Sequence, residues 1–529
     1  MSATAPAAKS SAKSTVESAA KSAGTHHDAP LRGTALLIAG FTLALANFMV
    51  VLDTTIANVS VAHIAGSLAI SASQGTWVIT SYAVAEAICV PLTGWLAGRF
   101  GSVKTFAVGM AGFGIFSLLC GASTTLTMLV VCRIGQGLCG GPLMPLSQTL
   151  MLRIFPPERR GQAMGIWAMT TVVAPILGPI LGGTLSDNWS WHWVFFINVP
   201  VAALCAFGAW RALGSRETPT ERVRIDRVGL ALMVVWIGAL QILLDLGRER
   251  DWFSDGLIVS LGLIALVGFV VFLVWELTED QPIVDLRVFR HRGFAASVAS
   301  MAFAFGTFFA TIVIVPQWLQ LALGYTATDA GYVTAFTGVA ALALSPIVGK
   351  LSNTADARLL TFFGIVWFGA TSLLRVQWTS GADFWTLAMP QIVQGIGMPF
   401  FFIPISIIAL GAVDPRETAS AAGVMGFLRT MSAAIGTSLS ISLWDDGTVA
   451  ARSEIVSRLN AGPTSDSLQQ SGFSLDQARA AIERIVQQES MTLASDHLFL
   501  ASSLIFLVAA GLIWIAPRPK QMAGSVPAH

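Results

Sequence analysis

Three ionisable residues fall inside long apolar stretches of the sequence, where charge is costly. Asp53 ends the run FMVVLD, Glu86 lies in the next apolar stretch, and Arg133 lies two stretches further on. A charged side chain in hydrocarbon costs at least about 2.5 kcal/mol. We therefore expect each of these side chains to be paired or to carry out chemistry.

Asp53 and Arg133 are predicted to form an ion pair across a central cavity. Asp53 lies about 18 residues into its apolar segment, and Arg133 about eight residues into a segment of opposite direction, so at about 1.5 Å per residue their depths are similar. A proton on Asp53 would weaken the pair and free the helices to rearrange, which is a hypothesis for proton coupling. The alternative is a permanent ion pair that fixes helix packing.

Glu86 and Arg429 leave more than one role open. Glu86 lies in the middle of its segment, one turn after Tyr82, and either titrates, attracts a cation in a cavity, or is a satisfied structural carboxyl. Arg429 lies in the middle of a late segment. It either holds an anion, balances a carboxylate, or fixes helix packing.

The elements that position these residues are predicted to be membrane-spanning helices. The chain is 54% hydrophobic and 12% charged, about half the charge fraction of soluble domains. We expect an all-α polytopic membrane protein with fourteen spans of about 20 residues. The spans are predicted to begin near Ala35, Thr76, Val103, Thr125, Gly161, Trp193, Val228, Gly256, Gly293, Asp329, Arg358, Phe384, Ala419 and Asp496.

Charge in the loops predicts the orientation. Lys and Arg gather after the second, fourth, sixth, eighth, tenth and fourteenth spans, which places these loops and both termini in the cytoplasm. The net charge is +1 and no basic patch appears, so no nucleic-acid partner is expected. The five cysteines form no CxxC pair, and no metal site is expected.

An internal repeat at an offset of 258 residues divides the chain. RIGQGLCGGP (133–142) parallels QIVQGIGMPF (391–400), with Gln136 matching Gln394 and Gly137 matching Gly395. Duplicated halves with a site between them are typical of secondary transporters. We expect a disordered cytoplasmic tail (1–33), a six-helix half (34–213), a linker with two extra helices (214–277), a second half (278–517) with a long periplasmic loop (443–495), and a cytoplasmic tail (518–529).

That loop contains a helical pattern of its own. In LDQARAAIERIVQQ (475–488), apolar residues recur at helical spacing, which predicts an amphipathic helix leading into the last span. It serves either as a solvated lid or as an element on which a partner docks.

Seven motifs in order carry a family resemblance over residues 30–515. They are LDTTIANVS (52–60), GWLAGRFGSVK (94–104), RIGQG (133–137), APILGPILGG (174–183), WHWVFFINVP (191–200), PIVDLRVF (282–289) and FLRTMSAAIGTSL (427–439). Together they resemble the fourteen-span drug:proton antiporter branch of the major facilitator superfamily, and most of all its EmrB-type multidrug exporters.

The resemblance implies a function and a setting. It implies export of hydrophobic drugs or toxic amphiphiles across the bacterial inner membrane by alternating access, with H⁺ as coupling ion and no other cofactor. It also implies a tripartite system with a periplasmic membrane-fusion adaptor and an outer-membrane channel. The alternative is a dedicated exporter of one endogenous metabolite, siderophore or fatty acid.

A membrane enzyme is disfavoured because no HExxH, GxSxG or P-loop motif is present. A non-transporting sensor is disfavoured by the cost of the intramembrane charges.

The resemblance also assigns motif residues. The loop motif contributes Gly94, Arg99, Gly101 and Lys104, the fourth-helix motif contributes Arg133, Gln136 and Gly137, and the antiporter motif contributes Gly178, Pro179, Gly182 and Gly183. These glycines should let a neighbouring helix approach closely, and the proline should permit a bend. Gly98 stands where the loop motif usually has Asp, so the latch that this Asp supports is in doubt.

An apolar substrate cavity is expected between the halves, since Met and aromatic side chains suit varied hydrophobic ligands. Packing in the core or against lipid is the alternative for each residue. The candidates are Trp167, Met169, Gln394, Phe427 and Arg429.

Overall fold

The computed structural model describes residues 30–518, apart from residues 221–224, 248–249, 281, 415–416, 460–463 and 465–467. Within these residues the regular structure is entirely helical. The first half contains α2 (Gly33–Ser67), α3 (Ala72–Cys89), α4 (Thr93–Phe100), α5 (Ser102–Gly121), α6 (Leu126–Gly140), α7 (Leu143–Ile154), α8 (Arg160–Asn188), α9 (Trp193–Phe196) and α10 (Asn198–Leu213). The inserted pair is α11 (Arg227–Leu246) and α12 (Gly256–Thr278), and the second half contains α13 (Arg292–Leu321), α14 (Ala327–Leu351), α15 (Ala357–Arg375), α16 (Phe384–Gly411), α17 (Thr418–Arg458) and α19 (Leu475–Leu512).

The number of spans agrees with the sequence. Twelve described helices are long and apolar enough to cross a membrane, and two bent pairs raise the total to as many as fourteen. One bent pair is α3 with α4, at 59°, and the other is the two parts of α8, at 42°. Side-chain caps start several helices: Thr125, Thr326 and Asp383 each accept a hydrogen bond from a free backbone N–H of the first turn.

The internal repeat is visible in the helix boundaries. The starts of α6 and α16, and those of α8 and α17, are each separated by 258 residues. Gly137 of α6 lies so close to α3 that a Cβ would be 2.5 Å from the Tyr82 carbonyl oxygen. Its repeat partner Gly395 of α16 lies even closer to α14, since a Cβ there would collide with the Thr337 carbonyl oxygen. The two halves therefore use glycine for the same helix approach.

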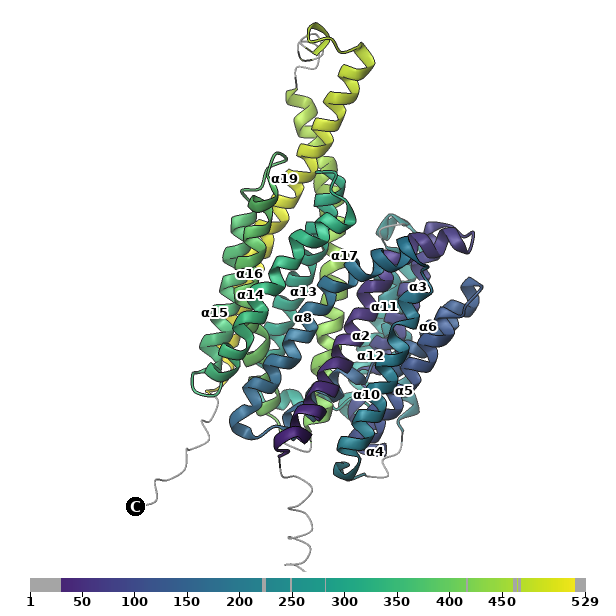
Figure 1. The fold of residues 1–529 in the computed structure, drawn as a ribbon, viewed down its shortest axis with the longest axis vertical. Coiled ribbons are helices and arrows are strands. Elements are labelled where there is room, and N and C mark those ends of the chain that lie inside the picture. The colour runs from purple at the N-terminus through teal and green to yellow at the C-terminus, as the bar shows by residue number, and fades with distance from the viewer. Residues whose placement is uncertain are drawn as a thin grey trace, which may run out of the picture.

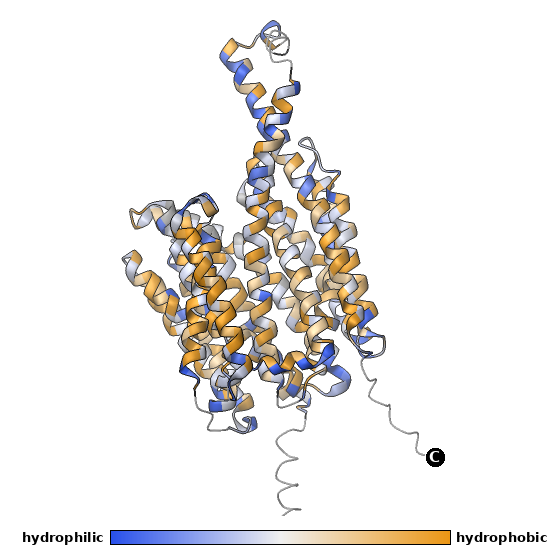
Figure 2. Ribbon diagram, turned by 180° about the vertical axis from the view of Figure 1, so that it is seen from behind, coloured by the Kyte–Doolittle hydropathy of each residue, from blue (hydrophilic) through white to orange (hydrophobic). Residues whose placement is uncertain are grey.

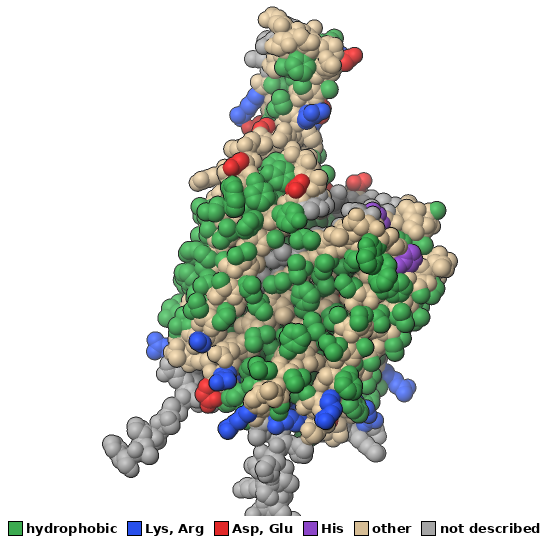
Figure 3. Space-filling model, viewed as in Figure 1, with side chains coloured by type: hydrophobic (Ala, Val, Ile, Leu, Met, Phe, Trp, Pro, Cys, Tyr) green, Lys and Arg blue, Asp and Glu red, His purple; other side chains and the backbone are tan. Residues whose placement is uncertain are grey.

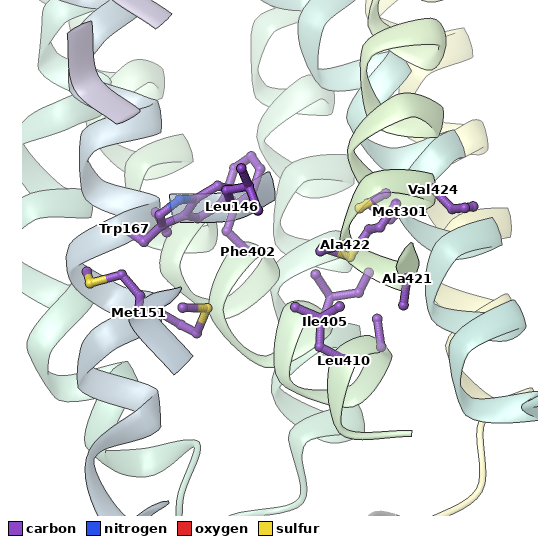
Figure 4. Packing of buried hydrophobic residues seen from close by; sticks show 14 of the residues in the cluster. Leu146, Met151, Trp167, Met301, Phe402, Ile405, Leu410, Ala421, Ala422 and Val424 are labelled. Atoms are coloured by element: carbon purple, nitrogen blue, oxygen red, sulfur yellow. The ribbon is translucent and has the colours of Figure 1, made fainter. Parts of the chain in front are cut away.

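The two halves lie side by side (Figure 1). Of the inserted helices, α11 packs on α3 of the first half, and α12 packs on α11. The helix pair α8–α14 connects the halves, and α4 and α7 of the first half pack on α17 of the second. One apolar core runs through both halves: Figure 4 shows Trp167 and Leu146 of the first half beside Phe402 of the second. The halves are thus joined by packed side chains as well as by the chain itself.

The surface matches a protein immersed in lipid. Hydrophobic side chains cover the flanks of the bundle (Figure 3), and the ribbon there is predominantly apolar (Figure 2). Lys and Arg side chains gather at the end where α4 lies, which we call the Arg-rich end (Figure 3). The described chain starts and finishes at this end. Its assignment to the cytoplasm remains a prediction.

The expected long loop is mostly helical. α17 continues to Arg458 and α19 begins at Leu475, so residues 444–458 and 475–495 form a helical hairpin that projects beyond the bundle (Figure 1). The amphipathic helix is confirmed as helix, but it is one element with the last span. Trp444 Nε1 donates to Ser495 Oγ at 2.9 Å at the base of the hairpin. Arg452 and Glu483 form an ion pair of 2.9 Å further out.

Candidate functional site

The predicted Asp53–Arg133 ion pair is present in the first half. Arg133 Nη1 lies 2.7 Å from Asp53 Oδ2, and the side chains are 1% and 0% exposed. α2 carries the acid and α6 the base. Because the pair is wholly buried, its charges are not screened by solvent and each depends on the other.

Two amides complete the hydrogen bonding of this carboxylate. Gln136 Nε2 and Asn198 Nδ2 donate to Asp53 Oδ1 at 2.9 and 2.6 Å. Gln136 Oε1 in turn accepts from Arg133 Nη1 at 2.9 Å. Asn198 of α10 also donates to Ser117 Oγ at 3.2 Å. The site is therefore a four-residue network, Asp53, Arg133, Gln136 and Asn198, which we call the Asp53 network.

Arg133 has further partners that do not depend on Asp53. Its Nε donates to the Val78 carbonyl of α3 at 3.0 Å. Its guanidinium carbon lies 4.1 Å from the centre of the Tyr82 ring, within the range of a cation–π contact. The close approach of α6 to α3 at Gly137 brings both partners within reach.

Asn198 was not singled out by the sequence, although it lies inside the motif WHWVFFINVP. A neutral amide in an apolar stretch carries little of the cost that marks a charge. Its position at the start of α10 directs it at the acid of α2. The motif itself was the only available signal.

Glu86 and Arg429 approach the interface between the halves from opposite sides. Glu86 of α3 is partly exposed, whereas Arg429 of α17 is 5% exposed. The Arg429 guanidinium lies 5.1 Å from the centre of the Trp167 ring and contacts the Met144 sulfur. No ion pair between Glu86 and Arg429 is formed among the described residues.

The other predicted cavity residues do not form one wall. Trp167 is fully buried and donates to Ser147 Oγ at 2.9 Å, so it packs in the core. Phe427 is half-buried, 5.8 Å from the ring of Trp236 on the inserted α11, and Met169 is half-buried on α8. Gln394 lies inside the second half.

A cavity of about 620 Å³ lies between α11 and α17. Its lining includes Gln241, Leu244 and Asp245 from α11 and Thr437 and Ile441 from α17. The volume is in the range of small-molecule sites. Asp245 lies near the end of α11 and supplies the one carboxylate among the described lining residues.

The loop motif holds the Arg-rich end together. A Cβ on Gly94 would lie 2.7 Å from Ser420 Cα of α17, so glycine permits contact between the halves. Gly101 has φ +91°, a conformation that favours glycine. A Cβ on Gly98 would meet nothing within 4 Å. Arg99 lies in the last turn of α4 and is partly exposed, and Lys104 is exposed in the first turn of α5.

A carboxylate from beyond α10 caps α5. Glu217 accepts from the backbone N–H groups of Val103 and Lys104 at 2.9 and 2.7 Å. A carboxylate at a helix N-terminus accepts from the free backbone N–H groups and is attracted by the positive end of the helix dipole. This contact joins the start of the inserted segment to the loop motif.

The antiporter motif packs α8 against α2. A Cβ on Gly178 would collide with Thr55, and one on Gly182 would lie 2.8 Å from the Ile56 carbonyl oxygen. The close approach expected at Gly183 is wrong, because a Cβ there would meet nothing within 4 Å. The bend of 42° falls between Pro175 and Ile180, and the side chain of Pro179 is outside the described part.

Comparisons with known proteins agree with this architecture. Residues 43–437 match the family model described as Major Facilitator Superfamily. The multidrug export protein EmrB of Escherichia coli K12 is 43% identical over 501 residues, covering 94% of this chain and 98% of that protein. The fatty acid resistance protein FarB of Neisseria gonorrhoeae is 42% identical over 500 residues, covering 94% and 99%.

Solved structures resemble the fold at low sequence identity. The human organic anion transporter MFSD10 has a TM-score of 0.55 at 13% identity, covering 91% of this chain and 100% of that chain. The proton:xylose symporter XylE has a TM-score of 0.59 at 12% identity, covering 92% and 97%. The chain is therefore a multi-pass membrane protein that belongs to the Major Facilitator Superfamily.

Proposed function

We propose that the chain is a proton-coupled antiporter that exports hydrophobic drugs or toxic amphiphiles by alternating access. The Asp53 network carries the proposal, because it holds one buried acid whose charge ties three helices together. The similarity to EmrB, a multidrug export protein, supports the substrate class.

Proton binding would change the Asp53 network in a defined way. With Asp53 ionised, α2, α6 and α10 share one carboxylate. A proton on Asp53 removes its charge and the strong attraction to Arg133. Arg133 keeps the Val78 carbonyl, Gln136 Oε1 and the Tyr82 ring. These contacts therefore hold the Arg133 side chain in place while α2, which carries Asp53, is released.

Movement of α2 has a route to the second half. α2 packs against α8 at Gly178 and Gly182, and α8 packs against α14 along the interface between the halves. Interfaces packed this closely shift between discrete arrangements more readily than they deform. Release of α2 would thus allow α8 and α14 to slide, which reorients the cavity between the halves.

Glu86 and Arg429 are proposed to meet the polar end of an amphiphile. They approach from opposite halves beside buried aromatic and Met side chains. A cationic drug would be held by Glu86 and an anionic one by Arg429.

The proposed setting is the bacterial inner membrane, with the Arg-rich end in the cytoplasm. The helical hairpin would then project into the periplasm and serve as the docking element for a membrane-fusion adaptor, which passes substrate to an outer-membrane channel. Its length beyond the bundle supports this role (Figure 1).

The test is a proteoliposome assay with a pH-sensitive dye enclosed. A gradient of a hydrophobic cation is imposed, and proton movement is recorded for wild type and Asp53→Asn. Asp356→Asn is the matched control, because Asp356 also pairs with an arginine, Arg358, but lies outside the Asp53 network. The proposal expects proton movement in wild type and control only. Normal coupling in Asp53→Asn would refute it.

A further inference from the structure

A second buried arginine lies in the other half without a carboxylate. Arg375 is the last residue of α15 and is 1% exposed. Although Arg375 lies at a helix end, its side chain does not snorkel to water. Its guanidinium carbon lies 5.7 and 5.8 Å from the ring centres of Trp378 and Phe499. Packing of α19 over α15 encloses it.

The polar partners of Arg375 are two amides. Its Nη2 donates to Gln391 Oε1 at 2.6 Å and also to Gln394 Oε1. Thr337 Oγ1 donates to the same Gln391 oxygen at 3.2 Å. These contacts fix the amide orientations, because only the oxygen of each amide can accept. The two amide nitrogens therefore take no part in this contact and remain available to donate to another group.

Comparison with the first half shows which partner Arg375, Gln391 and Gln394 lack. At the offset of 258, Gln394 matches Gln136, Gln391 matches Arg133, and Arg375 matches Ser117. Gln136 accepts from an arginine and passes its own N–H to Asp53. Gln394 likewise accepts from an arginine, but its Nε2 has no acceptor. Among the described residues, Gln136 therefore has an anionic acceptor, whereas its repeat partner Gln394 has none.

Several donors of this arginine and its two amides have no acceptor. Arg375 Nε and Nη1, Gln391 Nε2 and Gln394 Nε2 are buried and have no hydrogen-bond partner. Among the described residues no carboxylate pairs with Arg375: on α19, Glu489 accepts from Ser380, and Asp496 Oδ1 is buried without a hydrogen-bond partner. A buried, unpaired guanidinium is strongly unfavourable. A neutral water could satisfy donors but not the charge.

We propose that Arg375, Gln391 and Gln394 bind a small inorganic monovalent anion of the chloride class. The anion accepts from the guanidinium and the amide nitrogens, as Asp53 accepts from Arg133, Gln136 and Asn198 in the first half. The anion would neutralise the charge of Arg375 and hold α15 against α16. The inference does not depend on the proposed transport activity.

The test compares thermal unfolding of the purified full-length protein in chloride and in gluconate, a bulky anion, at equal ionic strength. Wild type should unfold a few degrees higher in chloride, because a ligand that binds only the folded state stabilises it. Equilibrium binding of radiolabelled chloride should show one site. Equal unfolding temperatures in the two salts, or no bound chloride, would overturn the proposal.

Gln391→Glu provides a sharper variant, since it adds a fixed carboxylate beside Arg375. It should raise the unfolding temperature in gluconate and abolish both the chloride dependence and chloride binding. The matched control is Gln241→Glu, which places the same change in the cavity between α11 and α17 and should leave chloride binding intact. Chloride binding that persists in Gln391→Glu would contradict the assignment.

Discussion

Replacing Asn198 with alanine tests how the carboxylate of Asp53 is held in its charged form. Asn198 Nδ2 donates to Asp53 Oδ1 at 2.6 Å, the shortest bond in the Asp53 network. A hydrogen bond to a charged group contributes about 1.5–3 kcal/mol. Since about 1.4 kcal/mol corresponds to one pH unit, losing it should move the pH midpoint of transport upward by about one to two units. The direction is upward because the lost bond favours only the ionised acid.

The assay is substrate transport in proteoliposomes across a range of external pH, with the midpoint fitted for each variant. Asn188→Ala is the matched control, because Asn188 is exposed and donates only to the Thr184 carbonyl within its own helix. Its midpoint should equal that of wild type. An unchanged midpoint in Asn198→Ala, or the same shift in both variants, would refute the reasoning.

Two further predictions concern the Arg-rich end. Gly94→Ala should separate α4 from Ser420 and reduce transport at least several-fold, because its Cβ would lie 2.7 Å from a backbone carbon. Gly98→Ala has open space around its Cβ and should transport normally. Equal activity in the two variants would contradict this packing. The hydrogen bonds from Arg358 lower the pKa of Asp356, so the ion pair stabilises the fold above the usual pKa of 3.8 and is lost as pH falls through the lowered value. Asp356→Asn should therefore lower the unfolding temperature at pH 7 and have no effect at low pH, as measured by thermal unfolding; a loss equal at both pH values would point to the helix cap alone.

The Asp53–Arg133 pair could be predicted because its cost in lipid singles it out. Helix rise then places both residues at one depth, and the pair is present at 2.7 Å. Asn198 escaped prediction because a neutral amide carries no such signal. Which amide reaches the acid depends on how α10 packs beside α2, which is a tertiary property.

The burial of Arg375 could not be predicted from hydropathy. Its position at the end of an apolar segment is compatible with exposure to water, but the rings of Trp378 and of Phe499 from α19 enclose it. The repeat did contain a clue, since Gln394 matches Gln136 while no acid accompanies it. That clue becomes meaningful once the partners of both amides are known.

The spans were predicted in number and order, but their ends were not. Hydropathy falls after Trp444, yet α17 continues to Arg458 because α19 packs beside it, with the bond from Trp444 to Ser495 at the base and the Arg452 ion pair further out. Helical structure outside the membrane depends on such pairing, which a single segment does not reveal.

The most direct test of proton coupling separates transport from coupling in Asp53→Asn. In proteoliposomes without a pH gradient, exchange of labelled for unlabelled substrate reports binding and alternation alone. With an imposed gradient, uphill accumulation reports coupling. The proposed role of Asp53 predicts that Asp53→Asn exchanges substrate at a rate within a few-fold of wild type and accumulates none above equilibrium. Uphill accumulation by Asp53→Asn at the wild-type level would contradict it.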